Sequence, residues 1–234
     1  FLQRIEPNPF HQKFPFKKKL VMKNVNDLID LLNLEQIASN TFKGISKTIG
    51  SPNVFGGQVL AQALNAANRT VPEERILHSL HSYFLEAGKL EVPIIFIVEE
   101  MRDGGSFSTR RVKAMQNDVI IFILAASFHK IEAGFEHQKA IKKNIKQPEE
   151  LISWNEIVDQ FGDFIPKNMR AFLSIERPID FKPTVIPNPL DPQDLPAQDN
   201  IWFKLKGDSE GLDRKMKQQI RTYISDYNVL NASI

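Results

Sequence analysis

The feature that most constrains this sequence is the stretch VFGGQVLAQALNAANRT, residues 54–70. It is rich in residues that favour a helix, and it carries no charge before Arg69. A helix that is uncharged around most of its circumference must be enclosed on most sides by the rest of the chain. With 234 residues, 42% of them hydrophobic, the chain is long enough to build such an enclosure. The sequence therefore predicts a buried central helix.

The segments on either side of this helix can enclose it. A strand is predicted at 41–46 (TFKGIS), after an amphipathic helix at 25–38. Four β-rich runs follow the central helix, and their short connections favour antiparallel neighbours. These runs are ILHSLHSYFL, VPIIFIVEEM, SFSTRRVKAM and VIIFILAASFH. A strand, a buried helix and an antiparallel meander are the order of a hotdog, a curved sheet wrapped around one helix, and they predict an α+β fold.

The second half of the sequence repeats the opening of the first half. A charged linker begins near residue 139, and two helical stretches follow it. A strand candidate that ends in Lys-Gly (NIWFKLKG), a turn and a helix from about Leu212 then come in order, without a second meander. We expect one complete hotdog and an incomplete second one. The expected divisions are a disordered basic tail at 1–24, an N-terminal hotdog domain at 25–138, a linker with helices at 139–173 and a partial second hotdog domain at 174–234.

The composition argues against several classes of function. The 30 basic and 28 acidic residues are mixed along the chain, so the net charge of +2 gives no broad cationic face for nucleic acid. No apolar run approaches the roughly 18 to 20 residues that span a membrane. The absence of cysteine removes disulfides, thiolate catalysis and sulfur-ligated metals, and it is compatible with a reducing compartment. We expect a cytoplasmic protein that uses no metal and no cofactor.

An aspartate near the end of the last predicted helix is the first candidate site residue. On a helical wheel of about 100° per residue, the apolar residues of 212–227 form one stripe, and Asp226 lies about 40° outside Leu212, at the border of that stripe. The helix dipole disfavours a negative charge near a C-terminus by a few tenths to about 1 kcal/mol. Position alone leaves two interpretations open. Asp226 is either a carboxylate that caps the next turn or lies in water at a rim, or a functional group.

Several long strings in the sequence resemble the acyl-CoA thioesterase II family, the TesB-like double-hotdog enzymes. They are FGGQVLAQALNAA, VPEERILHSLHSYFL, RDGGSFSTRRV, AASFHKIEAGFEHQ, PNPL and YISDYNVL, and the match runs from about residue 25 to the C-terminus. The resemblance implies two hotdog units in tandem that hydrolyse acyl-CoA to free fatty acid and CoA without a metal. It also implies a homo-oligomer that pairs through the hotdog sheets.

In that family an aspartate, a threonine or serine, and a glutamine position the attacking water. Asp226, in SDYNVL, matches the aspartate, whereas the other two belong to polypeptide downstream of Ile234. Thr222 and Gln219 do not stand at the matching positions. The resemblance thus implies an acyl-CoA thioesterase whose chain is shortened at its C-terminus. The alternative is a catalytically inactive remnant that binds acyl-CoA or a partner chain, with the apolar stripe of its last helix exposed.

Three further residues are candidates for substrate binding. Gly56 and Gly57 open the central helix, where free backbone N–H groups suit an oxyanion or a phosphate. The alternative for this pair is that glycine lets a neighbouring strand approach closely. Arg110 and Arg111 are adjacent in a predicted strand, so they point to opposite faces and at most one can reach a CoA phosphate in a given groove. Arg110 is the candidate, and a solvated sheet face is expected for the other.

Overall fold

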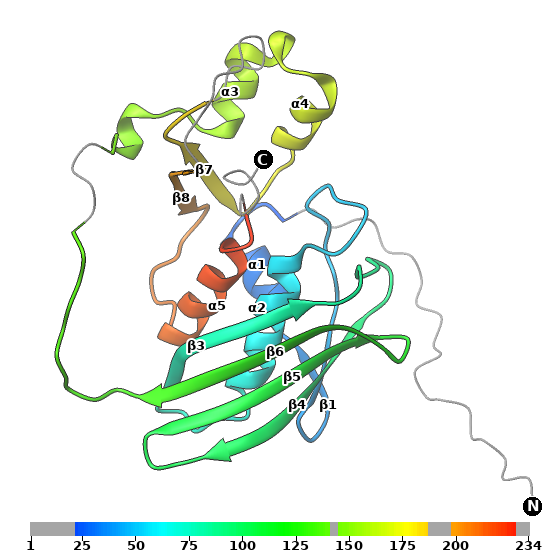
Figure 1. Cartoon of the computed structure of the whole chain (residues 1–234). Coiled ribbons are helices and arrows are strands. Elements are labelled where there is room, and N and C mark those ends of the chain that lie inside the picture. The colour runs from blue at the N-terminus through cyan, green and yellow to red at the C-terminus, as the bar shows by residue number, and fades with distance from the viewer. Residues whose placement is uncertain (1–21, 141–144, 187–197, 228–234) are drawn as a thin grey trace, which may run out of the picture.

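The computed structural model describes residues 22–140, 145–186 and 198–227, and the helix expected within residues 54–70 lies at its centre (Figure 1). This helix, α2, runs from Gly56 to Asn68. Every residue from Gly57 to Asn68 is buried. The prediction of a central helix enclosed on most sides is therefore confirmed.

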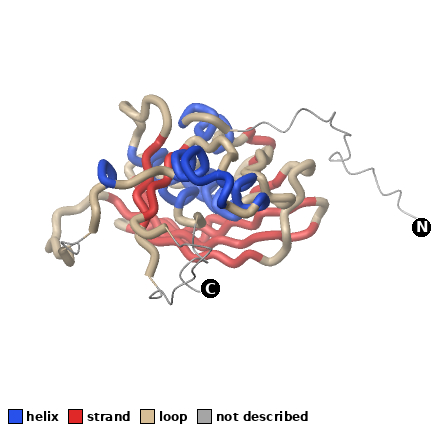
Figure 2. Tube along the Cα trace, turned by 90° about the horizontal axis from the view of Figure 1, so that it is seen from above, coloured by secondary structure: helices blue, strands red, loops and turns tan. Residues whose placement is uncertain are grey.

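A six-stranded antiparallel sheet curves around one side of α2 (Figure 1). Its spatial order is β1-β2-β4-β5-β6-β3. In Figure 2 the helices gather on one side of these strands. The strands are β1 (Glu35–Ala38), β2 (Thr41–Gly44), β3 (Arg75–Phe84), β4 (Ile94–Asp103), β5 (Phe107–Gln116) and β6 (Val119–Lys130).

Strand alternation explains why the sheet packs on α2. Successive side chains of a strand point to opposite faces, and in β5 every second residue from Ser108 to Gln116 is buried. Val112 of β5 and Phe96 of β4 contribute to one apolar core with Leu64 of α2, and all three side chains are fully buried. Burying a large apolar side chain stabilises a fold by about 1.5–3 kcal/mol. This core therefore holds α2 against the sheet.

The first helix is shorter than the predicted span of 25–38. Helix α1 runs from Val25 to Leu32, and Asn24 caps its first turn together with Asp27. Asn33 leaves the helical conformation, and residues 35–38 form β1 instead. A left-handed residue, Asn40 with φ of 53°, then turns β1 back onto β2. The helical pattern of apolar residues continued past Asn33 in the sequence because Leu34 is apolar. Leu34 is buried in the core under the sheet, however, and not by a helix.

The four long strands do not form a simple meander, so that expectation is wrong. β3 pairs with β6 at the edge of the sheet, and β4 lies between β2 and β5. Residues 85–93 carry the chain from β3 to β4 across the end of the sheet. Gln116 holds this connection, because its side chain accepts from the Lys89 N–H at 2.8 Å and donates to the Lys89 and Val92 carbonyls. A connection of this length does not force its two strands to be neighbours.

The second half of the chain lies on the side of α2 that the sheet leaves open. Helix α5 packs along α2, and β7 and β8 form a two-stranded antiparallel sheet near the end of α5 (Figure 1). The divisions at 139–173 and 174–234 stay predictions, and residues 141–144, 187–197 and 228–234 lie outside the described residues. The elements are η1 (Pro148–Glu150), α3 (Trp154–Phe161), η2 (Gly162–Phe164), α4 (Lys167–Leu173), β7 (Ile179–Pro183), β8 (Ile201–Leu205) and α5 (Arg214–Ile224).

The tail expected at 1–24 lies outside the described residues as far as residue 21. Met22 is buried, with 2% of its surface exposed, and Asn24 caps α1. Residues 22–24 therefore belong to the folded part of the chain, and the tail stays a prediction for residues 1–21.

Helix α5 is fixed in place from two sides. Ile220, Tyr223 and Ile224 are buried in a second core that includes Ala61 of α2. The Gln218 side chain of α5 pairs with the edge of β3, because it accepts from the Leu77 N–H at 3.2 Å and donates to the Leu77 carbonyl at 2.9 Å. None of the six apolar residues in the predicted stripe is exposed, so the expected exposed patch is absent from this described helix. They are Leu212, Met216, Ile220, Tyr223, Ile224 and Tyr227.

Glycine at position 57 permits this close helix packing. A Cβ atom built on Gly57 would lie 2.3 Å from the Tyr223 carbonyl oxygen of α5 and 2.6 Å from the Phe55 ring. The close approach expected from a strand is thus made by a helix. Because the obstructing atom belongs to backbone, the contact can be relieved only if α2 and α5 separate.

We predict that Gly57→Ala destabilises the protein. Alanine normally stabilises a helix by about 0.5–1 kcal/mol relative to glycine, but overpacking costs about 1–3 kcal/mol, so the clash outweighs the gain. Urea unfolding followed by circular dichroism measures the change. Gly105→Ala is the matched control, because a Cβ on Gly105 has no atom within 4 Å. Equal stabilities of the two variants would contradict the predicted clash.

Candidate functional site

The structure brings Asp226 to the N-terminus of the central helix. α5 ends at Ile224, and Asp226 lies in the turn that follows. Its Oδ2 atom accepts a hydrogen bond from the Gly57 N–H at 2.8 Å. Two predicted site residues that are 169 positions apart in the sequence are therefore in direct contact, and Gly56 adjoins them.

The first turn of α2 needs an acceptor from another part of the chain. The N-cap residue of α2, Phe55, has no side-chain oxygen and makes no capping hydrogen bond. The first N–H groups of any helix lack partners inside the helix, and the partial positive charge there favours an anion. The Asp226 carboxylate supplies both the acceptor and the negative charge. It therefore lies at the favourable end of one helix dipole as well as near the unfavourable end of its own.

Aromatic rings fix the turn that carries the carboxylate. Phe55 packs edge to face on Tyr223 with ring centroids 5.2 Å apart, and it packs on Tyr227 in a tilted arrangement at 4.5 Å. The two tyrosine hydroxyls lie 3.3 Å apart and share a hydrogen bond. Tyr227 also packs on Phe181 of β7 at 4.9 Å. The residues on both sides of Asp226 are thus held by the residue that precedes α2 and by the second sheet.

Burial and hydrogen bonding act on the Asp226 carboxyl in opposite directions. Burial disfavours the charged form and raises the pKa of Asp226 above its usual value of 3.8, and the Gly57 N–H offsets part of that increase. The net pKa is raised. A carboxylate with a raised pKa is a better proton acceptor than a fully solvated aspartate.

A cavity of about 390 Å³ borders Gly56, the residue next to the one that bonds Asp226, and Asp226 itself does not line it. Gly56 forms part of its wall, and the ring of Phe84 lies directly over Gly56. Phe84 was not among the predicted site residues, although Tyr83, Phe84 and Leu85 place three bulky apolar residues in a row where β3 ends. The lining residues are Asn53, Val54, Gly56, Val59, Phe84, Leu85, Glu86, Ala87, Gly88, Ile121 and Phe122.

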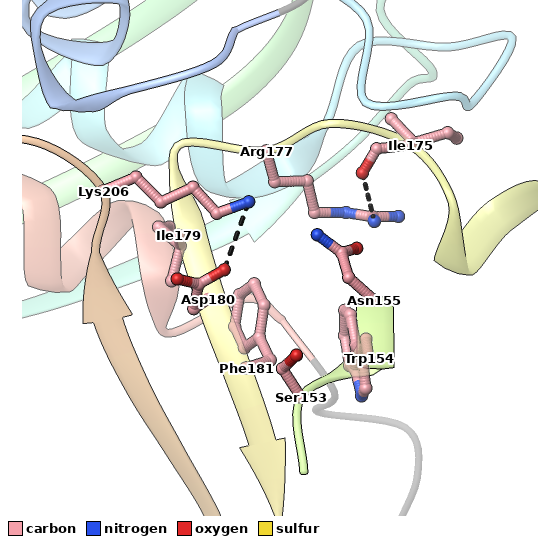
Figure 3. Close-up of a pocket in the computed structure, with 9 residues that line it drawn as sticks. All are labelled: Ser153, Trp154, Asn155, Ile175, Arg177, Ile179, Asp180, Phe181 and Lys206. Carbon is pink, nitrogen blue, oxygen red and sulfur yellow. Dashed lines mark hydrogen bonds and ion pairs between the residues drawn. The ribbon is translucent and has the colours of Figure 1, made fainter. Parts of the chain in front are cut away.

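A second hollow lies between α3 and β7 and is far smaller (Figure 3). It encloses about 10 Å³, which is about the room that one water molecule requires. Its wall is closed by an ion pair between Lys206 and Asp180 at 3.1 Å, and by the buried Arg177, which donates to the Ile175 carbonyl at 2.9 Å. This hollow is too small for a metabolite, so the larger cavity is the candidate site.

Arg110 does not belong to the candidate site, and that prediction is corrected. Its side chain is fully buried and donates to the Asp103 carboxylate at 2.9 and 3.0 Å, and to the Thr70 carbonyl at 2.8 Å. Thr70 follows the C-terminus of α2, whereas Gly57 lies in the first turn of that helix, and 13 residues of helix span roughly 20 Å. Arg110 therefore links the sheet to the opposite end of α2.

The described residues contain neither a cluster of metal ligands nor a membrane-spanning helix. Among them, no three histidine, aspartate or glutamate side chains are grouped closely enough to hold a metal ion. In the same part of the chain, no helix has the length and apolar content that crossing a membrane requires.

Comparison with known proteins identifies relatives along most of the chain. The family model of the acyl-CoA thioesterase N-terminal domain matches residues 45–129. The chain is 40% identical to acyl-CoA thioesterase 2 of Haemophilus influenzae over 206 residues, which are 88% of this chain and 71% of that protein. It is 35% identical to human acyl-coenzyme A thioesterase 8 over 212 residues, which are 87% of this chain and 66% of the human protein.

Solved structures agree with these relatives. The acyl-CoA thioesterase II TesB2 from Mycobacterium marinum superposes with a TM-score of 0.66 at 31% identity, over 87% of this chain and 69% of that one. A hot dog protein of unknown function from Alicyclobacillus acidocaldarius gives a TM-score of 0.61 at 17% identity, over 82% and 67% of the two chains. The second likeness concerns the fold alone. The prediction of an α+β hotdog fold is confirmed.

We predict that Asp226→Asn becomes more stabilising as the pH rises. The folded carboxyl has a raised pKa, so the folded state holds its proton more tightly than the unfolded chain does. Its contribution to stability is then complete below the unfolded pKa of about 3.8 and is lost as the pH rises through the folded pKa. Asparagine keeps an oxygen for the Gly57 N–H and carries no charge.

Urea unfolding of the parent and of Asp226→Asn at a series of pH values from about 4 to 7 tests this prediction. The difference in unfolding free energy should grow with pH and then level off. Asp30→Asn is the control, since Asp30 is an exposed residue of α1. A difference that is constant with pH, or that shrinks as the pH rises, would contradict the raised pKa.

Proposed function

This chain belongs to the acyl-CoA thioesterase II family, and from that premise we propose that Asp226 activates the water that hydrolyses an acyl-CoA thioester. The observation that supports this role is the contact of the Asp226 Oδ2 atom with the Gly57 N–H at 2.8 Å, beside a cavity of about 390 Å³. The same residue matches the family's catalytic aspartate by its place in SDYNVL.

The proposed chemistry begins with a proton transfer. Asp226 accepts a proton from water while the water oxygen adds to the thioester carbonyl carbon. The resulting tetrahedral intermediate collapses, the carbon–sulfur bond breaks, and the sulfur of CoA leaves as a thiolate that takes up a proton. The products are a free fatty acid and CoA. The partial burial that raises the pKa of Asp226 increases its basicity for the first step.

The bond from Gly57 gives Asp226 a fixed orientation. An oriented base needs no reorganisation when the water reacts, and such positioning contributes much of the rate of enzymatic reactions. The Gly57 N–H is used for this purpose, so in this arrangement it holds the base rather than the oxyanion. The family's two other water-holding residues, a threonine or serine and a glutamine, match no position in this chain, which spans 71% of the Haemophilus influenzae relative.

Two expectations from the sequence stay proposals. Pairing of copies through the hotdog sheets is supported by the position of β3 at the edge of the sheet, where part of its backbone is available to another strand. A cytoplasmic location is supported by the absence of cysteine from the sequence.

The test of the proposed function is release of CoA from a fatty acyl-CoA, followed with a thiol reagent. We expect Asp226→Ala to lower kcat/KM by at least about 100-fold, since a general base contributes about 10²–10⁴. Asp30→Asn is the control carboxylate and should retain the parent rate.

Two outcomes would contradict the proposal. Equal rates for the parent and Asp226→Ala would remove Asp226 from the reaction. A parent chain that binds acyl-CoA without turnover would instead support the alternative, a non-catalytic protein that binds acyl-CoA.

The pH dependence of hydrolysis gives an independent prediction. Only the ionised carboxylate accepts a proton, so kcat/KM should fall as the pH decreases through the pKa of Asp226. That pKa is raised by burial, so the decline should begin above the range of an ordinary aspartate. The profile of kcat/KM between about pH 4 and 8 measures it. An acidic limb centred near 3.8 or lower would contradict the raised pKa.

A further inference from the structure

Phe84 is an exposed aromatic residue in a position that core packing does not explain. It is the last residue of edge strand β3, and 53% of its surface is exposed. Its ring lies 5.0 Å from that of Phe122, which is almost fully buried. A phenylalanine that is 53% exposed forgoes about half of the stabilisation that full burial would bring. The Phe84 ring therefore lines the cavity at some cost to the stability of the fold.

Gly56 connects this ring to the carboxylate. A Cβ atom built on Gly56 would lie 2.7 Å from Asp226 Oδ2, and 2.9 and 3.0 Å from two atoms of the Phe84 ring. The carboxylate and the edge of the ring thus lie within 3.0 Å of one point over the same glycine. Any larger residue at position 56 would fill this point.

The same two residues form part of the cavity wall. Gly56 and Phe84 line it, together with the apolar side chains of Val54, Val59 and Ile121. Its volume of about 390 Å³ lies within the range of about 300–1,000 Å³ that is usual for small-molecule sites. The carboxylate and the ring therefore close over Gly56 from two sides, and Gly56 and the ring border the apolar cavity.

The chemistry of a thioester suits this arrangement. If the carbonyl lies at Asp226, the hydrocarbon chain attached to it requires an apolar space that begins next to the carboxylate. The cavity beside Gly56 is such a space. Gly88 also lines the cavity and packs closely there, since a Cβ on it would lie 3.1 Å from Val54 and 3.4 Å from Ile121 of the same wall.

We propose that Phe84 is a specificity-determining residue, whose ring forms the wall between Asp226 and the cavity and limits the length and width of the acyl chain that is accepted. This inference rests on the proposed function. Phe122 also lines the cavity, but it is packed in the core, whereas 53% of the Phe84 surface is exposed. Its neighbour Tyr83 points to the other face of the sheet and does not line the cavity.

The test compares Phe84→Ala and Phe84→Trp with the parent chain, using Tyr83→Ala as the matched control. Tyr83 is also exposed, at 68%, so its truncation removes a similar aromatic group from the same strand. Dissociation constants are measured by calorimetry for a series of saturated acyl-CoAs from butyryl to palmitoyl. Hydrolysis rates are measured with the same series. Thermal unfolding checks that each variant is folded, and Phe84→Leu replaces Phe84→Ala if that variant does not fold.

We expect Phe84→Ala to shift the ratio of the affinities for palmitoyl-CoA and butyryl-CoA about 10-fold toward the longer chain, and Phe84→Trp to shift it toward the shorter chain. A single methylene in an apolar pocket changes discrimination by about 10–200-fold. Tyr83→Ala should leave the ratio unchanged.

The two measurements separate the inference from the proposed function. Chain-length shifts in binding without turnover would support the role of Phe84 while the proposed hydrolysis fails. Turnover that depends on Asp226 with no shift in any Phe84 variant would overturn the role of Phe84 alone. An equal shift in Tyr83→Ala, or a parent chain that does not bind acyl-CoA, would overturn it as well.

Discussion

The requirement that α2 be enclosed from every side determines how the rest of the chain is arranged. The sheet covers one side, and α2 also carries buried amide side chains, two of which donate hydrogen bonds to neighbouring helices. Gln62 donates to the Leu31 carbonyl of α1 at 2.8 Å, and Asn65 donates to the Gln219 side chain of α5 at 3.0 Å. A buried polar group that is left unpaired costs about 1–3 kcal/mol. The enclosure of α2 is therefore specific, because α1 and α5 have to supply particular acceptors as well as apolar surface.

This enclosure accounts for the electrostatics of the candidate site. Packing of α5 along α2 brings the turn after α5 to the first turn of α2, where no residue of the local sequence caps the helix. The same packing takes Asp226 partly out of water, and burial disfavours its charge. One contact thus stabilises the helix end and holds a carboxylate in an environment that makes it more basic. A free carboxylate on the surface would have neither the orientation nor the raised pKa.

Much of the fold followed from local patterns in the sequence. The uncharged run at 54–70 identified the central helix, and the four apolar runs identified the long strands. The position of β3 at the sheet edge was missed, because connection length limits which strands can be neighbours without selecting among them. The first helix was extended too far, since Leu34 continued the apolar period but is buried by the sheet and not by a helix.

For the candidate site, the sequence identified the residue types but not their neighbours. Asp226 was chosen for its border position and its resemblance to a family motif, and the glycines for their place at a helix start. Their mutual contact depends on tertiary packing between segments 169 residues apart, which no local pattern contains. Arg110 was misjudged for the same reason. Alternation along the strand showed that it faces away from Arg111, and only the packed structure shows that this face is closed by Asp103 and Thr70.

The two hydrogen bonds between the Gln218 side chain and the Leu77 backbone fix the position of α5 along β3. They anchor one point of the helix to β3, and Asp226 follows eight residues later. Helix α5 continues from Gln218 to Ile224, and each helical residue advances about 1.5 Å and turns about 100°. The number of residues in this interval therefore sets the position and direction of the turn that carries the carboxylate. One residue gained or lost there would rotate it away from α2 while leaving the anchor intact. The position of the carboxylate therefore fixes the number of residues between Gln218 and Asp226.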